Sequence, residues 1–451
     1  MQPNRLIITL LLIGTACIRG FSQSSVLETY VEEGMKTNLA LQQQHISLEK
    51  NVAALQEAKA LFLPTLDLDA RYSRAAGGRL IEFPIGDILN PVYSTLNQLT
   101  ESSQFPTLNN EAIPFLRPQE HETRLRFVQP ILQPGILYNH QIRHTQVDIQ
   151  SNTVAVYKRQ LEADIRSSYY NYLKSIRVID LFKKVQALQE ENIAFNEKLF
   201  KNDKITYDVI YASKADLSET ELKLAEAEKN RKVATAYFNF LLNKSLDTDI
   251  LADTVFAFNN AIVPGEEELV ALSLQNREEL KQLNSGIVAS EQNVKLNRSR
   301  ALPTLNLVVD YGFQGAKYRF TSNDDYVQGS LLLNWRIFGG MQNRSRIAQA
   351  SLDKQHLQAQ QSELQNQIKL QVTTAAENAK VARKSIQTTT ERLESARKYF
   401  SIVNRKYREG AALYIEYLSA LTTLTNAGIS KILAEYDYQI KLIELNRIAA
   451  R

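Results

Sequence analysis

The stretch that decides the fold is LPTLDLDARY at residues 63–72, and it occurs again as LPTLNLVVDY at residues 302–311. In each copy a proline ends a long helix-like run, because proline lacks an N–H donor and disfavours helical backbone in the residue before it. Apolar and polar residues then alternate with the period of a β-strand that has two different surroundings. Pro64 and Pro303 are therefore predicted to be helix–strand junctions.

A second alternating run follows in each half of the chain, at residues 125–135 and 331–340. Both runs end at glycine and lead into a helical pattern, so Gly135, Gly339 and Gly340 are predicted to be strand–helix junctions. Each half reads helix, strand, loop, strand, helix, helix. The first half is longer because it carries an insertion rich in Gly, Pro and Asn at 77–121, which we expect to be a long loop.

Long helices are predicted for most of the remaining chain. Eight of the eleven prolines lie in residues 64–134, and the two long proline-free runs are rich in Ala, Leu, Gln, Glu and Lys. Apolar residues recur there at steps of three and four, as on a helix with one packed face. These runs break at 202–204 and 408–410, where we expect each helix to turn back as a hairpin. Gly410, like Gly135, is expected to adopt backbone angles that other residues resist.

The repeat divides the chain into four predicted segments. Residues 1–22 resemble a secretory signal peptide with a basic start and a short apolar run, and they contain Cys17, the only cysteine, whose lipidation stays open. The first repeat covers 23–242 and begins with a helix over 23–63. A connector with a short strand at 255–258 covers 243–265. The second repeat covers 266–451 and begins with a helix over 266–300.

The composition argues against an enzyme and against nucleic-acid binding. The 53 basic and 49 acidic residues nearly balance, so there is no electrostatic case for nucleic acid. No phosphate-binding glycine loop is present, and His140 and His144 lack the glutamate and third ligand of a zinc site. We therefore expect no catalytic residue, metal site or cofactor.

Four strands per chain pose a physical problem that assembly would solve. They are too few to close a barrel, and lipid does not tolerate an open sheet edge. Three copies supply twelve strands, which is within the size range of outer-membrane barrels. The expected fold is mainly α with a small β part. In this homotrimer, long antiparallel helical hairpins form an α-barrel, and the strands form a barrel in outer-membrane lipid.

The residues also resemble the TolC family of outer-membrane efflux and secretion channels, over nearly the whole chain after the signal segment. The resemblance rests on the duplicated plan, the twin Leu-Pro-Thr-Leu junctions and the stretch from Tyr407-Arg408-Glu409-Gly410 to Thr422-Thr423-Leu424. It implies a trimer in the cell outer membrane that extends into the periplasm. A periplasmic adaptor and an inner-membrane pump would dock at the helical tips.

The resemblance also suggests residues for the periplasmic aperture. In the family, a tyrosine and an arginine linked to an aspartate close the tip; Tyr407 and Asp208 match the first and last, but Ala412 replaces the arginine. Glu416 matches one acidic position of the opening and Ser419 replaces the other. Gly410 completes the candidate set. The alternative for Glu416 is a solvated residue of the helical turn.

Two functions from different classes follow from these patterns. The first is a passive trimeric export duct of a tripartite efflux or type I secretion system. The second is a secreted coiled-coil structural or adhesion protein without a pore, which would not need paired strands or matched halves. A periplasmic adaptor would require a lipoyl-like β domain, and no such run appears.

Overall fold

The computed structural model describes residues 26–252 and 264–451. The predicted signal peptide and the predicted strand at 255–258 lie outside these residues. The chain forms two compact units. Of the described residues, the helical unit comprises 26–45, 153–252, 264–280 and 364–451, and the sheet unit comprises Ile46–Asn152 and Lys281–Glu363.

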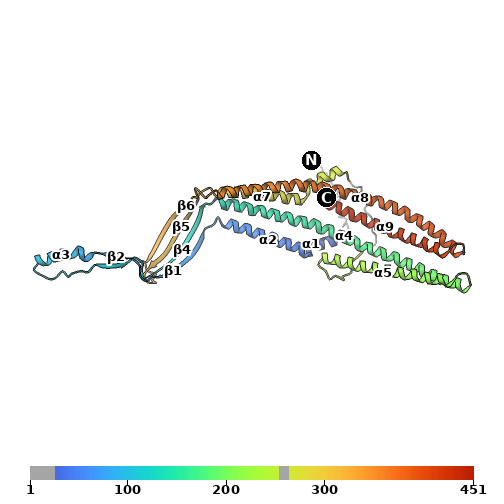
Figure 1. Ribbon diagram of the computed structural model, residues 1–451, viewed down its shortest axis with the longest axis horizontal. Coiled ribbons are helices and arrows are strands. Elements are labelled where there is room, and N and C mark those ends of the chain that lie inside the picture. Colours follow the sequence, from blue (N-terminus) through green and yellow to red (C-terminus); the bar gives the residue numbers. More distant parts are fainter. Residues whose placement is uncertain (1–25, 253–263) are drawn as a thin grey trace, which may run out of the picture. The chain divides into compact units, whose positions relative to one another are not determined.

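The order of elements repeats the predicted plan in each half (Figure 1). The helices are α1 (Val26–Thr37), α2 (Leu39–Ala60), α3 (Ile85–Leu99), α4 (Pro134–Lys201), α5 (Tyr207–Leu241), α6 (Glu266–Asn276), α7 (Glu278–Ser299), α8 (Gln342–Arg408) and α9 (Tyr414–Ile448). The strands are β1 (Thr65–Arg74), β2 (Leu80–Phe83), β3 (Glu111–Pro114), β4 (Gln119–Leu132), β5 (Thr304–Gly315) and β6 (Asp325–Asn334).

Two helices of unusual length dominate the chain, as predicted. Helix α4 has 68 residues and α8 has 67, which corresponds to about 100 Å each at a rise of 1.5 Å per residue. Pro134 is the first residue of α4, where a missing N–H costs nothing because the first helical N–H groups have no internal acceptor. The helices end at Lys201 and Arg408, which confirms both predicted hairpin turns.

The prediction of unusual backbone angles is confirmed at Gly410 and wrong at Gly135, and Gly340, predicted only as a junction, also adopts such angles. Gly410 has φ +76° and Gly340 has φ +61°, the left-handed backbone that glycine adopts without strain. Gly135 instead lies in the first turn of α4 without a positive φ. The preceding Pro134 already starts the helix, so no special backbone is needed there.

Each predicted opening helix is in fact two helices. The first breaks at Asn38, whose side chain accepts a hydrogen bond from the Leu41 amide at 2.9 Å and donates to the Leu241 carbonyl at 2.9 Å. The second breaks at Arg277, which adopts φ −60° and ψ 126° and donates to Gln371 at 2.6 Å. At both breaks a buried polar side chain forms hydrogen bonds. The two halves of the chain therefore also share a break in the opening helix.

The sheet unit is organised around one antiparallel sheet with strand order β1-β4-β5-β6 (Figure 1). The two predicted strands of each half therefore come together as four neighbours. β4 and β5, which belong to different halves, pair in the middle of the sheet, starting from His121 opposite Gly315. β1 and β6 form its two edges.

The insertion at 77–121 is not the loop that its composition indicates. It contains the β2–β3 hairpin and helix α3, as well as the start of β4. Asn90 exchanges two hydrogen bonds with the backbone of Leu108, at 2.9 and 2.8 Å, and Asn97 does the same with Phe105. Asparagine side chains thus hold the segment that follows α3 by pairing with its backbone.

The core of the helical unit contains several small clusters along the helices. One cluster joins Leu269 and Leu280 to an alanine-rich stretch of α8 and to the end of α9. Alanine lets helix backbones approach closely, which suits bundles whose side chains interdigitate. Tyr30, Tyr169 and Phe238 form a second, aromatic cluster with ring centroids 5.0–6.1 Å apart.

Candidate functional site: sheet faces and helical turns

One face of the four-stranded sheet carries charged residues that neutralise one another. Arg126 of β4 donates two hydrogen bonds to Asp310 of β5, both at 2.8 Å. Arg124 lies beside Glu122 at 2.9 Å and Asp69 of β1 at 3.3 Å. Bidentate arginine–carboxylate pairs fix geometry as well as charge, so this face is a preformed polar surface that spans at least three strands.

The opposite face of the same sheet is apolar and exposed. The register places one apolar residue of each strand in a single row across the sheet: Leu68, Leu125, Tyr311 and Val327. Their exposed fractions are 70%, 43%, 43% and 72%. Such a continuous apolar surface requires a covering, because soluble monomers seldom expose large apolar patches.

The close approach of β4 and β5 depends on a glycine. Gly312 lies opposite Arg124, and a Cβ added to it would be 2.5 Å from the Thr123 carbonyl oxygen and 2.8 Å from the Arg124 Cα. Both are backbone atoms that cannot turn aside. Gly312 therefore makes room for Arg124 within the charged face.

The hairpin turn between α8 and α9 holds a cluster of three tyrosines. The Tyr407 and Tyr417 rings stack at 5.1 Å, and Tyr414 stacks on Tyr417 at 6.2 Å. Phe195 of α4 meets Tyr407 edge-on. Aromatic contacts in this distance range stabilise beyond simple burial, so this cluster fastens the α8–α9 turn to the end of α4.

Hydrogen bonds join this cluster to α4 and α5. The Tyr407 hydroxyl donates to Asn196 Oδ1 at 2.7 Å, and Asn196 Nδ2 donates to Ser213 Oγ at 2.8 Å. Asn196 is fully buried. Tyr414 donates to the Asp216 carboxylate at 2.7 Å, and Arg408 lies 2.5 Å from Glu191. The two hairpins are thus joined near their turns by buried hydrogen bonds of the tyrosines and by one exposed ion pair.

Burial sets the protonation of these tyrosines. It raises the pKa of Tyr417 to about 12 and raises the pKa of Tyr407 above its usual value. The pKa of Tyr414 is raised further, first by burial and then by its bond to the charged Asp216. All three hydroxyls are therefore protonated near neutral pH and can donate hydrogen bonds.

The structure brings only part of the predicted aperture set together. Tyr407 is buried, and no contact links it to Asp208, which is exposed in the first turn of α5. Glu416 is exposed in the first turn of α9, where its carboxylate accepts a hydrogen bond from the Leu413 amide at 3.2 Å. Gly410 forms the turn itself. The roles of these residues at an aperture remain predictions.

Sequence reasoning missed the partners of Tyr407. Asn192 and Asn196 stand one turn apart on α4, where an otherwise apolar face is interrupted by amides, and this interruption was the available signal. Metal binding gains no support at the histidines, because His140 packs edge-on against Phe62 whereas His144 lies 3.5 Å from Asp148. Within residues 26–252 and 264–451 no three His, Cys, Asp or Glu side chains converge as metal ligands.

Comparison with known proteins finds one family model that matches the second half of the chain. Residues 269–451 match the family model described as outer membrane efflux protein. The match covers the second repeat, which contains β5, β6 and the α8–α9 hairpin. No curated protein matches the chain.

Similarity of fold to solved structures extends over almost the whole chain. The structure resembles the CmeC outer membrane channel of Campylobacter jejuni with a TM-score of 0.79 and 15% identity, over 94% of this chain and 85% of that one. It also resembles the outer membrane protein VceC of Vibrio cholerae, with a TM-score of 0.76 and 14% identity over 94% of this chain and 95% of that one. The open state of the MtrE outer membrane channel of Neisseria gonorrhoeae gives a TM-score of 0.74 and 14% identity, over 94% of this chain and 88% of that one.

The matched family model is described as an efflux protein of the outer membrane, and the similar structures named here are outer-membrane channels or proteins. These similarities agree with the resemblance seen in the sequence, and none of them supports the adhesion alternative. Among the described residues, no helix combines the length and the apolar character needed to cross a bilayer.

Proposed function

We propose that three copies of this chain form a passive export duct that crosses the outer membrane and continues into the periplasm. The observation that carries the proposal is the sheet, which has one apolar face, one charged face and two unpaired edges. Three copies would contribute twelve strands to a barrel with lipid outside and water inside.

The strand directions suit such a closure. All neighbouring strands of the sheet are antiparallel, so β1 and β6 run in opposite directions. Edge β6 of one copy can therefore pair with edge β1 of the next in the antiparallel manner used throughout the sheet. Closure removes the edge that lipid would not tolerate.

The helices of a single copy also lack partners on part of their surface. Leu222, Val233 and Phe240 of α5 are exposed by 62–65%, and Leu370 and Val381 of α8 by 67–68%. Apolar residues at this exposure favour packing against further helices. Neighbouring copies would supply those helices and so extend the barrel as an α-helical tube.

The proposed duct works as one part of an assembly. A periplasmic adaptor and an inner-membrane pump would dock at the hairpin turns, and the pump would drive export. Around the turns, Leu413 and Ile415 are exposed by 68% and 64%, and Tyr207 and Tyr211 form an exposed aromatic pair. These side chains are available to a partner. Targeting through residues 1–22 belongs to the same proposal.

The proposal is tested by extracting the protein from outer-membrane fractions and measuring its mass and its conductance in planar bilayers. We expect a trimer that conducts ions. A stable water-soluble monomer without affinity for the outer membrane would refute the duct and favour a protein without a pore. Crosslinking at position 413 in cells checks the adaptor separately, since the pore does not depend on it.

A further inference from the structure

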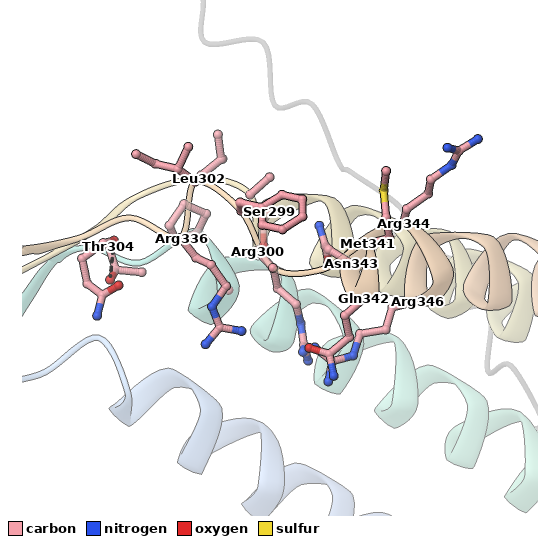
Figure 2. Close-up of a pocket in the computed structure, with 17 residues that line it drawn as sticks. Ser299, Arg300, Leu302, Thr304, Arg336, Met341, Gln342, Asn343, Arg344 and Arg346 are labelled. Carbon is pink, nitrogen blue, oxygen red and sulfur yellow. Dashed lines mark hydrogen bonds between the residues drawn. The ribbon is translucent and has the colours of Figure 1, made fainter.

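A cavity lined by four arginines lies where the second repeat passes between strand and helix. Its volume is about 500 Å³. Arg300 comes from the α7–β5 turn, Arg336 from the β6–α8 loop, and Arg344 and Arg346 from the start of α8. Figure 2 shows the side chains of Arg300, Arg336 and Arg346 directed to one side, whereas that of Arg344 points away.

These positive charges have no counter-charge among the described residues. The lining of the cavity includes no aspartate or glutamate, and none of the four arginines takes part in a described salt bridge. In contrast, Arg124 and Arg126 on the sheet are both paired with carboxylates. Arginines that converge without a carboxylate are suited to a bound anion, above all a phosphate, whose oxygens match the guanidinium fork.

Apolar side chains on the same loop indicate what carries the phosphate. Ile337 and Phe338 are exposed by 83% and 81%, and Met341 by 64%, and all three belong to the lining of the cavity. Trp335 is 58% exposed, and its indole N–H donates to the Ala301 carbonyl at 3.0 Å. An aromatic residue with one polar tip and one apolar body is typical of a membrane–water interface.

We propose that this cavity binds the phosphate headgroup of an anionic phospholipid, with the acyl chains against Ile337 and Phe338. The inference rests on the proposed function, which places the strand–helix junction at the periplasmic surface of the outer membrane. A free phosphate ion would use the arginines but not the apolar side chains. The lipid headgroup is therefore the ligand that accounts for both groups of residues.

The test measures binding of dioleoylphosphatidylglycerol to delipidated, detergent-purified trimer by native mass spectrometry. Dioleoylphosphatidylcholine and inorganic phosphate serve as comparison ligands. The variant replaces Arg300, Arg336 and Arg346 by Gln. Each arginine near a lipid phosphate contributes about fivefold to affinity, so the triple variant should lose about 100-fold. Arg300→Gln alone should lose about fivefold, which keeps the test valid if the triple variant fails to fold.

The control is Arg298→Gln, which removes an exposed positive charge two residues away and outside the cavity lining. Its affinity for phosphatidylglycerol should stay within twofold of the wild type. Equal binding of the two lipids, unchanged affinity in the triple variant, or displacement by phosphate at the lipid's own concentration would overturn the inference. Planar-bilayer conductance of the same samples separates the two proposals. Conducting trimers that bind no phosphatidylglycerol refute the lipid site alone, and preparations without conductance refute the duct.

Discussion

The hydroxyl of Tyr407 offers the sharpest test of how the helical hairpins are held together. Tyr407→Phe removes one oxygen atom and leaves the ring stack with Tyr417 in place. What it removes is the 2.7 Å hydrogen bond to Asn196 Oδ1. Since Asn196 is fully buried, water cannot take over the lost partner.

The expected cost follows from that burial. An unsatisfied buried acceptor costs about 1–3 kcal/mol, more than the net gain of an average hydrogen bond. If the segments around the turns open locally, this cost increases their amide hydrogen exchange by about 5- to 150-fold, at roughly 1.4 kcal/mol per factor of ten. The increase should be confined to the ends of α4 and α8 and the starts of α5 and α9.

Hydrogen exchange read by mass spectrometry on purified trimer measures this effect peptide by peptide. Tyr399→Phe is the matched control, because Tyr399 also lies on α8 but is 45% exposed. The double variant Tyr407→Phe/Asn196→Leu removes both partners and should cost less than the sum of the single variants. Exchange at the turns that equals the wild type in Tyr407→Phe, or that rises equally in Tyr399→Phe, would refute the reasoning.

Four further predictions concern the two sheet faces, the strand contact, the turn carboxylate and the tyrosines. Leu68→Arg should reduce trimer yield in outer membranes, because a charge on the lipid side costs roughly 2–4 kcal/mol at the midplane; Gln328→Arg on the charged face is the control, and equal yields contradict the assigned faces. Gly312→Ala should lower the thermal stability of the trimer by forcing β4 and β5 apart, and an unchanged melting temperature counts against the close contact. Glu416→Gln should lower cation selectivity but keep an acceptor for the Leu413 amide. Glu416→Ala should in addition destabilise the first turn of α9 by about 1 kcal/mol. An unchanged reversal potential in a salt gradient would exclude the effect of the charge on selectivity. Burial raises the pKa of Tyr417 to about 12 in the folded state, whereas an unfolded chain loses this proton near pH 10. The contribution of Tyr417 to folding stability is therefore complete below about pH 10 and is lost as the pH rises toward about 12. The melting temperature of Tyr417→Phe should decline less over this pH range than that of the wild type.

The sequence was sufficient for the parts of the fold that depend on periodicity. Pro64 and Pro303 stop helices by the chemistry of their own backbone, so the junctions could be located without any tertiary information. The helical turns follow from composition. Alternation located three of the four strands, but only the end of the fourth, because β6 covers Asp325–Asn334 and not the predicted 331–340. Their grouping into one sheet depended on the repeat, which indicated that the halves are equivalent.

Features that depend on specific partners could not be predicted. The break at Arg277 is supported by Gln371, which lies 94 positions later in the chain. The composition of the insertion alone suggests a loop. Its folded structure depends on the hydrogen bonds of Asn90 and Asn97 to the backbone. Tyr407 was selected through family resemblance, but its buried partner Asn196 is evident only from the packed structure.

The β2–α3–β3 segment between β1 and β4 has a consequence for the cell surface. It leaves the sheet at the end of β1 that lies opposite the helix junction at Pro64. If the strands cross the membrane, this folded segment lies on the extracellular side, with three copies in each trimer. Antibodies and bacteriophages could then bind this folded surface. Between β5 and β6, in the second half of the chain, there is no equivalent segment.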